Sequence, residues 1–333
     1  MKRMVAVITV IMLIVMFGYG CKGGTGSMAM VPTSSTASTV AITSGANNLL
    51  ITQKSDGGWQ WENPDTVTSS GVPTPNNTLG VTAQGLLDAY KTHPDALEMD
   101  GCINTYDRLV SNSTNVDPSV YKMRGPDITF LVELSEVTGN ATYAAFAKTR
   151  YQATLTAFGT GSATGLAQYI RDIRKGQGLP ALISWDINLY IQGVLALNRY
   201  YPGQGYDADA KAMAEVIYTS LYTPSVDFDL SNLDQASYWL SQTGAIEAFV
   251  TTGLHLAESA DLVKTLKESQ QSDGSFLDVI PPSSSEDAQA TAYAVMALLK
   301  AGEKAAAQKG VEYLIINQLP NGEWTEDAGS VEK

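Results

Sequence analysis

A seven-residue pattern that recurs three times constrains the fold of this chain more than any other feature of the sequence. The pattern is Gln, three residues, Gly, one residue and an aromatic residue, and an Asp or Asn precedes each Gly. The shared positions are Gln53, Gly57 and Trp59, then Gln270, Gly274 and Phe276, and finally Gln318, Gly322 and Trp324. Apolar residues stand four and seven positions before each Gln, at the spacing of one helix face. Asp-Gly or Asn-Gly favours a tight turn. Each copy therefore predicts a helix that ends near the Gln, a turn, and an aromatic residue that folds back.

A second series of residues marks the starts of apolar helices. Asn77, Asp127, Asp186, Asp234 and Asp287 each precede an apolar stretch, at intervals of 50, 59, 48 and 53 residues. More polar helical stretches lie at about 42–53, 96–111, 141–158, 206–222, 256–270 and 303–317. No long alternating pattern typical of a β-strand is present. The chain is therefore predicted to be all-α, with hairpins that pair an apolar inner helix with an amphipathic outer helix.

These repeats resemble those of a known family. The Gln-x-x-x-Gly-x-Trp segments, with the Thr82-Ala83 and Thr291-Ala292 pairs of two apolar helices, resemble the repeats of squalene cyclases and protein prenyltransferases. The resemblance covers about residues 42–333. It implies a terpenoid cyclase-like α/α toroid of about six helical hairpins, whose inner helices line a central cavity. It implies little about the reaction, because one ring fold serves unrelated functions.

The predicted ring is incomplete at the C-terminus. Six outer helices are predicted but only five inner ones, and the next inner helix would begin just beyond Lys333. We therefore expect an open seam between helices 79–92 and 287–300. The exposed apolar flank would include Ala292, Val295, Met296 and Leu299. Part of the segment 22–41, a partner chain, or residues missing from a truncated reading frame would fill it.

The N-terminus has the features of an export signal. Lys2 and Arg3 precede an apolar run of 14 residues, which is too short to span a bilayer and fits a signal peptide at 1–20. Small residues before Cys21 resemble a bacterial lipoprotein box, which implies cleavage before Cys21 and its acylation by a palmitate-type chain. Gly18 departs from the Leu usual in that box, and an ordinary secretory signal is the alternative. Residues 21–41 are predicted to form a flexible tether.

The residue after the predicted cleavage site bears on localisation. By resemblance to Gram-negative lipoproteins, Lys22 favours the outer membrane if the organism has one. Either type of signal predicts export, and the lipoprotein interpretation predicts a protein of the cell envelope with a lipid anchor to the membrane. The toroid domain is then predicted to occupy residues 42–333.

The composition excludes several classes of function. A net charge of −13 argues against nucleic acid, whose phosphates need a basic face. Two Cys and two His argue against a disulfide scaffold and a multi-histidine metal site. We therefore expect no nucleic-acid partner, no metal and no cofactor.

This sequence does not support the reactions of the family that its repeats resemble. Squalene-type cyclases use an acid in an Asp-x-Asp-Asp segment, which is absent here. The nearest segments are 227–230 and Glu286-Asp287. Prenyltransferases bind zinc through Asp, Cys and His. Asp100-Gly101-Cys102 has the Asp-x-Cys spacing of that family, and His255 could be the third ligand. Asp100 and Cys102 fall on a predicted outer helix, so Cys102 is expected to be a buried apolar residue instead.

The acidic residues at the helix starts have two interpretations. Parallel inner helices would place Asp127, Asp186, Asp234 and Asp287 at one mouth of the ring, near Trp185 and Trp239. They are either helix caps beside core aromatics or a site for a cation, polar ligand or glycan, where carboxylates can also hydrolyse glycosides. Arg171 and Arg174 lie in the extra residues of the longest repeat and form either a solvated face or a contact for an anionic ligand.

Three hypotheses for the function follow. The first is a binding or scaffold protein of the cell envelope, with a small-molecule or glycan ligand and no identified catalytic set. The second is a carbohydrate-active enzyme, a polysaccharide lyase or glycosidase, with its site at the acidic mouth. The third is a terpenoid cyclase. Under all three, Trp59, Phe276 and Trp324 are expected to brace successive hairpins.

Overall fold

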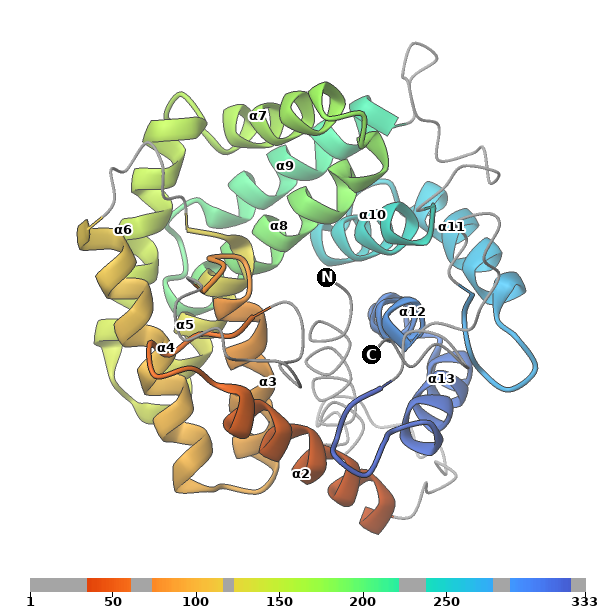
Figure 1. The fold of residues 1–333 in the computed structure, drawn as a ribbon. Coiled ribbons are helices and arrows are strands. Elements are labelled where there is room, and N and C mark those ends of the chain that lie inside the picture. Colours follow the sequence, from red (N-terminus) through yellow and green to blue (C-terminus); the bar gives the residue numbers. More distant parts are fainter. Residues whose placement is uncertain (1–34, 61–73, 116–122, 222–237, 278–287, 325–333) are drawn as a thin grey trace.

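The chain folds into helices arranged in two layers around a common centre (Figure 1). The computed structural model describes residues 35–60, 74–115, 123–221, 238–277 and 288–324. The inner helices are α3 (Leu79–Thr92), α5 (Gly125–Thr138), α8 (Ile183–Tyr200), α10 (Tyr238–Thr252) and α12 (Ala288–Lys300). The outer helices are α2 (Ser35–Thr52), α4 (Ala96–Asn115), α6 (Ala141–Phe158), α9 (Tyr206–Leu221), α11 (Leu256–Ser269) and α13 (Lys304–Ile316). The all-α prediction is confirmed, and the arrangement fits an α/α toroid.

One outer helix begins earlier than expected. Helix α2 starts at Ser35, so residues 35–41 belong to a helix and not to the predicted tether. Ala41 and Ile42 are buried in the core, which explains why this turn of helix is held in place. Cys21 and the predicted signal peptide lie outside the described residues.

The longest repeat contains an additional helix. Its extra residues form α7 (Ala163–Gly176) and the short 3-10 helix η1 (Pro180–Leu182), which precede α8. Ser162 caps α7 by accepting a hydrogen bond from the backbone N–H of Gly165. Leu166 and Ile170, on one face of α7, are buried, and this helix packs against α9. The insertion therefore adds a layer outside the ring instead of changing its order.

The seven-residue motif forms the same turn three times. In each copy the Gln side chain donates from Nε2 to the carbonyl of the motif Gly, at 3.0 to 3.2 Å. The Trp indole then donates to a carbonyl ten residues earlier: Trp59 bonds to Leu49 and Trp324 to Leu314. Both Trp side chains are buried, as is Phe276 in the remaining copy. The motif thus locks each outer helix to the turn that follows it, as the sequence predicted.

The same Gln also joins neighbouring outer helices. Its Nε2 donates to a carbonyl on the next outer helix, and the accepting residues are Gly101 on α4, Ala306 on α13 and Ala41 on α2. The motif Gly allows this close approach: a Cβ on it would lie 2.2 to 2.3 Å from a carbonyl oxygen of that helix. Its φ is also positive in all three copies. Only glycine therefore fits the turn without displacing the neighbouring helix.

The third copy joins the two ends of the domain. Gln318, after α13, bonds to Ala41, and Asn48 of α2 donates to Glu323 at 3.3 Å. The outer layer is therefore continuous between the C-terminal and N-terminal hairpins, and the prediction of a seam that separates them is wrong for this layer. Five inner helices are present within the described ranges, as predicted.

The predicted apolar flank of α12 is largely covered. Ala292 and Val295 have no exposed surface, while Met296 and Leu299 are half-buried. Val295 packs against Gly310 of α13, inside its own hairpin, which is why it is not exposed at a seam.

No helix of the described part is both long and apolar enough to cross a membrane.

Glycines allow the inner helices to approach one another closely. A Cβ on Gly80 of α3 would lie 2.4 Å from the backbone of Asp127 on α5. A Cβ on Gly125 would lie 2.0 Å from the Leu189 carbonyl of α8. One on Gly244 of α10 would lie 2.7 Å from the backbone of Trp185. The inner helices are therefore in contact at backbone distance, which fixes how their side chains face the middle of the ring.

Candidate binding site on the inner helices

Asp127 makes structural hydrogen bonds at the start of α5. It lies in the first turn of α5, where its carboxylate accepts hydrogen bonds from the backbone N–H groups of Arg124 and Gly80. The side chain is buried, and burial raises its pKa to about 6, although these hydrogen bonds oppose the shift. The helix-cap interpretation is therefore confirmed for Asp127, with the additional role of joining α5 to α3.

Of the other acids of the predicted mouth, the structure describes only Asp186. Asp186 lies in the first turn of α8 and makes an ion pair with Arg174 of α7, while Arg171 pairs with its neighbour Asp172 at the surface. Asp234 and Asp287 lie outside the described residues. Of the four predicted acids, the two that the structure describes are thus already occupied by partners within the chain.

The zinc set of the prenyltransferases is not assembled. Cys102 is buried, with its Sγ 3.7 Å from the Ala83 carbonyl, and burial holds the pKa of the thiol above its ordinary value. Asp100 is exposed, and His255 stacks on Tyr218 at 3.7 Å between ring centroids. The described residues contain no group of acids, Cys and His that could hold a metal ion. Cys102 is the buried apolar residue that the sequence predicted.

The predicted aromatic residues do come together. Trp185 of α8 contacts Tyr293 of α12, with ring centroids 4.2 Å apart, and Trp239 of α10 stacks on the same Tyr293 at 5.6 Å. Trp185 is half-buried, whereas Trp239 and Tyr293 are buried. Tyr190, in contrast, is a core residue whose hydroxyl donates to the Met123 carbonyl. The aromatic cluster of Trp185, Tyr293 and Trp239 thus links three inner helices.

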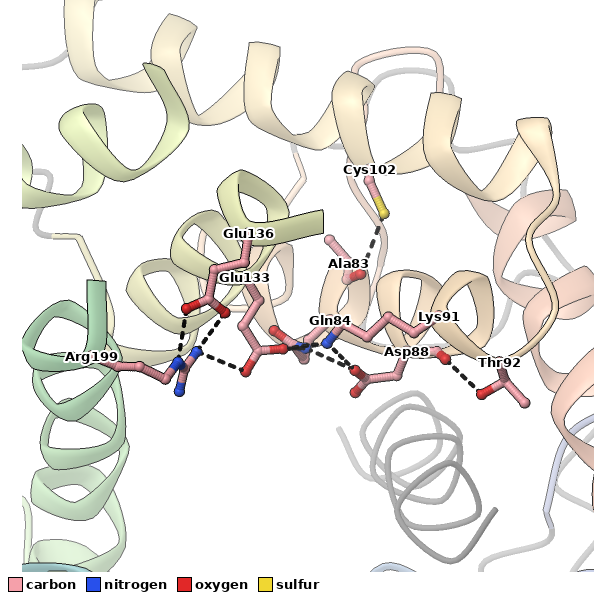
Figure 2. A network of polar contacts seen from close by, with 9 residues as sticks. All are labelled: Ala83, Gln84, Asp88, Lys91, Thr92, Cys102, Glu133, Glu136 and Arg199. Carbon is pink, nitrogen blue, oxygen red and sulfur yellow. Dashed lines mark hydrogen bonds and ion pairs between the residues drawn. The ribbon is translucent and has the colours of Figure 1, made fainter. Parts of the chain in front are cut away.

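A network of charged side chains joins α3, α5 and α8 (Figure 2). Lys91 donates to Asp88 on its own helix at 2.8 Å and also to Glu133 of α5. Gln84 donates to the same two carboxylates, at 3.1 Å and 2.8 Å. Two acids on adjacent inner helices therefore share one ammonium group and one amide. Figure 2 shows that they project away from α4, the outer helix that carries Cys102.

Arg199 extends the network to α8. Its guanidinium binds both carboxylate oxygens of Glu136, at 2.8 and 2.9 Å, and lies 3.7 Å from Glu133. A bidentate contact of this kind fixes the orientation of both side chains. Glu133 is thus held from one side by Lys91 and from the other by Arg199.

The two shared carboxylates are tuned in opposite directions. Burial raises the pKa of Asp88 to about 6, against the pull of Lys91, and the charge of Glu133 adds to this rise. Burial would also raise the pKa of Glu133, but Lys91, with Gln84 and Arg199, outweighs burial and lowers it. The two acids hold the pKa of Lys91 above its ordinary value in spite of burial. At neutral pH the network therefore keeps Lys91 and Glu133 charged, with Asp88 close to its titration range.

A second polar group joins α8 and α10. Asn188 donates to Glu247 at 3.2 Å, and Gln192 donates both to Asn188 and to Thr251 of α10. Glu247 is 2% exposed, and burial raises its pKa. Its Oε1 has no hydrogen-bond partner among the described residues, and neither has Oε1 of Gln84 in the charged network. Each group therefore presents a buried acceptor that is not satisfied within this part of the chain.

The sequence carries a signal for these residues. Polar side chains recur at helical spacing inside the apolar stretches, as in Gln84, Asp88 and Lys91, or Asn188, Gln192 and Arg199. Positions three and four apart share one face of a helix. A polar stripe on an otherwise apolar helix therefore indicates a functional face. The sequence does not indicate which residues these polar side chains contact, because the partners lie 42 to 63 residues away.

Comparison with known proteins leaves the family open. No protein-family model matches the sequence, and no curated protein matches it significantly.

Proposed function

We propose that this protein is an exported, lipid-anchored protein of the cell envelope that binds a polar ligand on the inner helices of its ring. The export signal and the acylation of Cys21 rest on the N-terminal sequence. The repeats resemble those of squalene cyclases and prenyltransferases, and this resemblance bears on the fold alone.

The unsatisfied buried acceptors carry this proposal. A buried acceptor without a partner costs about 1–3 kcal/mol, so folded proteins rarely retain one without a role. Glu247 and Gln84 each have such an oxygen, on inner helices that already hold ordered polar groups. A ligand that donates hydrogen bonds to them would remove this cost on binding. Binding sites commonly combine an apolar lining with a few placed polar groups of this type.

The polar face argues against terpenoid cyclisation. A hydrocarbon substrate would have to displace water from Asp88, Lys91 and Glu133 without replacing its hydrogen bonds, at a cost of several kcal/mol. The Asp-x-Asp-Asp acid of that chemistry is also missing from the sequence. A polar ligand can replace these hydrogen bonds, and its binding needs no such acid.

One observation favours a carbohydrate-active enzyme as the second candidate. Two nearby acids whose pKa values are driven apart are the usual signature of a proton donor and a carboxylate partner. Asp88, with a pKa of about 6, and Glu133, with a lowered pKa, have this relationship. In this case the site would be the charged network of α3 and α5 and not the predicted acidic mouth.

Two measurements test the proposal. Cys21→Ser should release the protein from the membrane fraction or leave it uncleaved, and unchanged fractionation of the cleaved variant would defeat the anchoring part. For binding, the purified chain should be stabilised against heat by at least one member of a panel of oligosaccharides, amino acids, peptides and nucleotides. Glu247→Gln and Gln84→Leu should reduce that shift. If both variants are stabilised by the ligand as much as the wild type is, the ligand does not bind at these groups of the inner helices.

The same panel separates the two candidates. A binding protein leaves each ligand unchanged after prolonged incubation. Release of new reducing ends or unsaturated sugars, abolished by Asp88→Asn or Glu133→Gln in a folded protein, would establish the enzyme instead.

A further inference from the structure

The aromatic cluster joins the two inner helices that flank α10. Helices α8 and α12 both pack against α10, and the outer helices α9 and α11 contact it as well. Trp185 and Tyr293 belong to the two flanking inner helices, yet their rings are 4.2 Å apart. Because α10 lies between α8 and α12 (Figure 1), the two rings reach past this helix to meet. Trp239, from α10 itself, lies against Tyr293 at an interplanar angle of 24°.

A polar edge adjoins these rings. Asn188 follows Trp185 by three positions on α8 and so lies on the same side of that helix, one turn further on. Asn188 donates to Oε2 of Glu247, and the amide oxygen of Asn188 accepts a hydrogen bond from Gln192. This arrangement fixes Glu247 with one oxygen bound and the other, Oε1, without a partner among the described residues. A half-buried indole, a fixed amide and an unsatisfied buried carboxylate thus lie next to one another.

This combination matches the surface of a sugar. A pyranose ring has an apolar face of C–H groups, which packs on an aromatic ring, and an edge of hydroxyl groups, which need fixed acceptors and donors. Glu247 Oε1 can accept from a hydroxyl donor, and Gln192 and Thr251 extend the polar edge towards the charged network. The polar side chains of this edge, Asn188, Gln192 and Thr251, are uncharged. Glu247 opposes an anionic ligand, and the positive charge of Lys300 on α12 acts on this same carboxyl group.

We propose that Trp185, Tyr293, Trp239, Asn188 and Glu247 form a subsite for one unit of a neutral saccharide. Trp185 packs on the sugar ring, and Glu247 accepts a hydrogen bond from one of its hydroxyls. The inference rests on the proposed function and names the ligand class of that site. The burial that raises the pKa of Glu247 also makes a hydrogen bond to it stronger than one at the surface.

Isothermal titration of the purified full chain tests this subsite. The probes are cellotriose, maltotriose, xylotriose and chitotriose, with choline as a quaternary ammonium and trigalacturonate as an anion. We expect at least one neutral trisaccharide to bind. Trp185→Ala and Glu247→Gln should each weaken its binding at least tenfold, and Trp185→Phe, which keeps an aromatic ring and the packing, should weaken it less.

Matched controls keep a folding defect from imitating this result. Tyr200→Ala removes a half-buried aromatic residue further along α8, and Glu258→Gln removes a carboxylate from α11. Both should leave trisaccharide affinity unchanged. If Trp185→Ala melts early, Glu247→Gln and Trp185→Phe still decide the question, because neither removes side-chain volume on a comparable scale.

The remaining outcomes separate the subsite from the proposed function. Binding of choline or trigalacturonate but of no neutral sugar, lost in Glu247→Gln, would overturn the saccharide class and leave the binding function intact. Trisaccharide binding that neither variant affects would overturn this location. Failure of every probe in titration, together with no stabilisation by the wider panel, would overturn both.

Discussion

Gln318 donates a hydrogen bond to the carbonyl of Ala41, a residue 277 positions earlier, and this contact joins the last outer helix to the first. It repeats the contact that Gln53 makes with Gly101 on the next outer helix. One local motif therefore joins three pairs of outer helices, including the last and the first. Because the contact between Gln318 and Ala41 joins the first and last hairpins, the stability of each depends on the other.

The turn that makes this closure gives the first prediction. Gly322→Ala adds a Cβ 2.2 Å from the Ser44 carbonyl of α2, at a residue with positive φ. Gly302→Ala is the matched control, because its φ is also positive but nothing lies within 4 Å of the added Cβ. We expect Gly322→Ala to lower the free energy of unfolding by about 1–3 kcal/mol more than the control does. Urea denaturation measures both. Equal losses would show that the contact with α2 is not formed.

The buried indoles of the motif give the second prediction. Trp324→Ala should cost about 3–5 kcal/mol, as truncation of a fully buried aromatic residue usually does. Trp324→Phe should cost only about 1–2 kcal/mol, since it loses the hydrogen bond to Leu314 but keeps most of the packing. Phe276 already occupies the equivalent position in another copy. Thermal unfolding checks the order of the two variants. If the Trp324→Ala protein melts like the wild type, Trp324 does not brace the fold.

Lys91 gives the third prediction. Lys91→Met leaves the buried Asp88 and the half-buried Glu133 without their shared cation, so we expect a loss of about 1–3 kcal/mol at pH 8. The loss should shrink towards pH 4, because in the variant no ammonium group opposes the protonation of the two carboxyls. Lys211→Met removes an exposed ion pair with Asp207 and should cost under about 1 kcal/mol at either pH. A pH-independent loss in Lys91→Met would contradict the network.

Glu98 gives the fourth prediction. Burial, with the nearby charge of Asp95, raises the pKa of Glu98 to about 7, and its Oε2 has no partner among the described residues. Because the folded state holds the proton more tightly than the unfolded state, the stability that this group contributes is complete below about pH 4.5. It is lost as the pH rises through 7. Glu98→Gln should therefore stabilise the protein at pH 8, by about 1–3 kcal/mol, and have little effect at pH 4.

A control for Glu98 exists on another outer helix. Glu258 occupies the same position in the first turn of α11 that Glu98 occupies in α4, but it is only half-buried. Glu258→Gln should show no comparable gain at pH 8. Urea titrations at the two pH values measure the difference. If Glu98→Gln destabilises the protein equally at both, the carboxyl is not held in its neutral form.

The local structure followed from the sequence because its causes are local. The helix that ends at Gln53, the turn at Gly57 and the return of Trp59 all lie within a dozen residues, so spacing and turn chemistry predicted them. The same holds for the buried state of Cys102 and for the cap-like role of Asp127. Helix α2 starts earlier than the sequence predicts, and one contact that holds its first turns is the hydrogen bond from Gln318, at the other end of the domain, to the Ala41 carbonyl.

The candidate site depended on the tertiary structure. Helical spacing alone places Gln84, Asp88 and Lys91 on one face, but it cannot show that Glu133 and Arg199 meet them. Nor could it separate Asp127, which caps a helix, from Glu247, which keeps an unsatisfied oxygen, because both are acids on apolar helices. The sequence by itself determined the helices and the turns that join them. Only the packing of the inner helices decided which polar groups are buried together, because burial and shared hydrogen bonds arise between residues far apart in the chain.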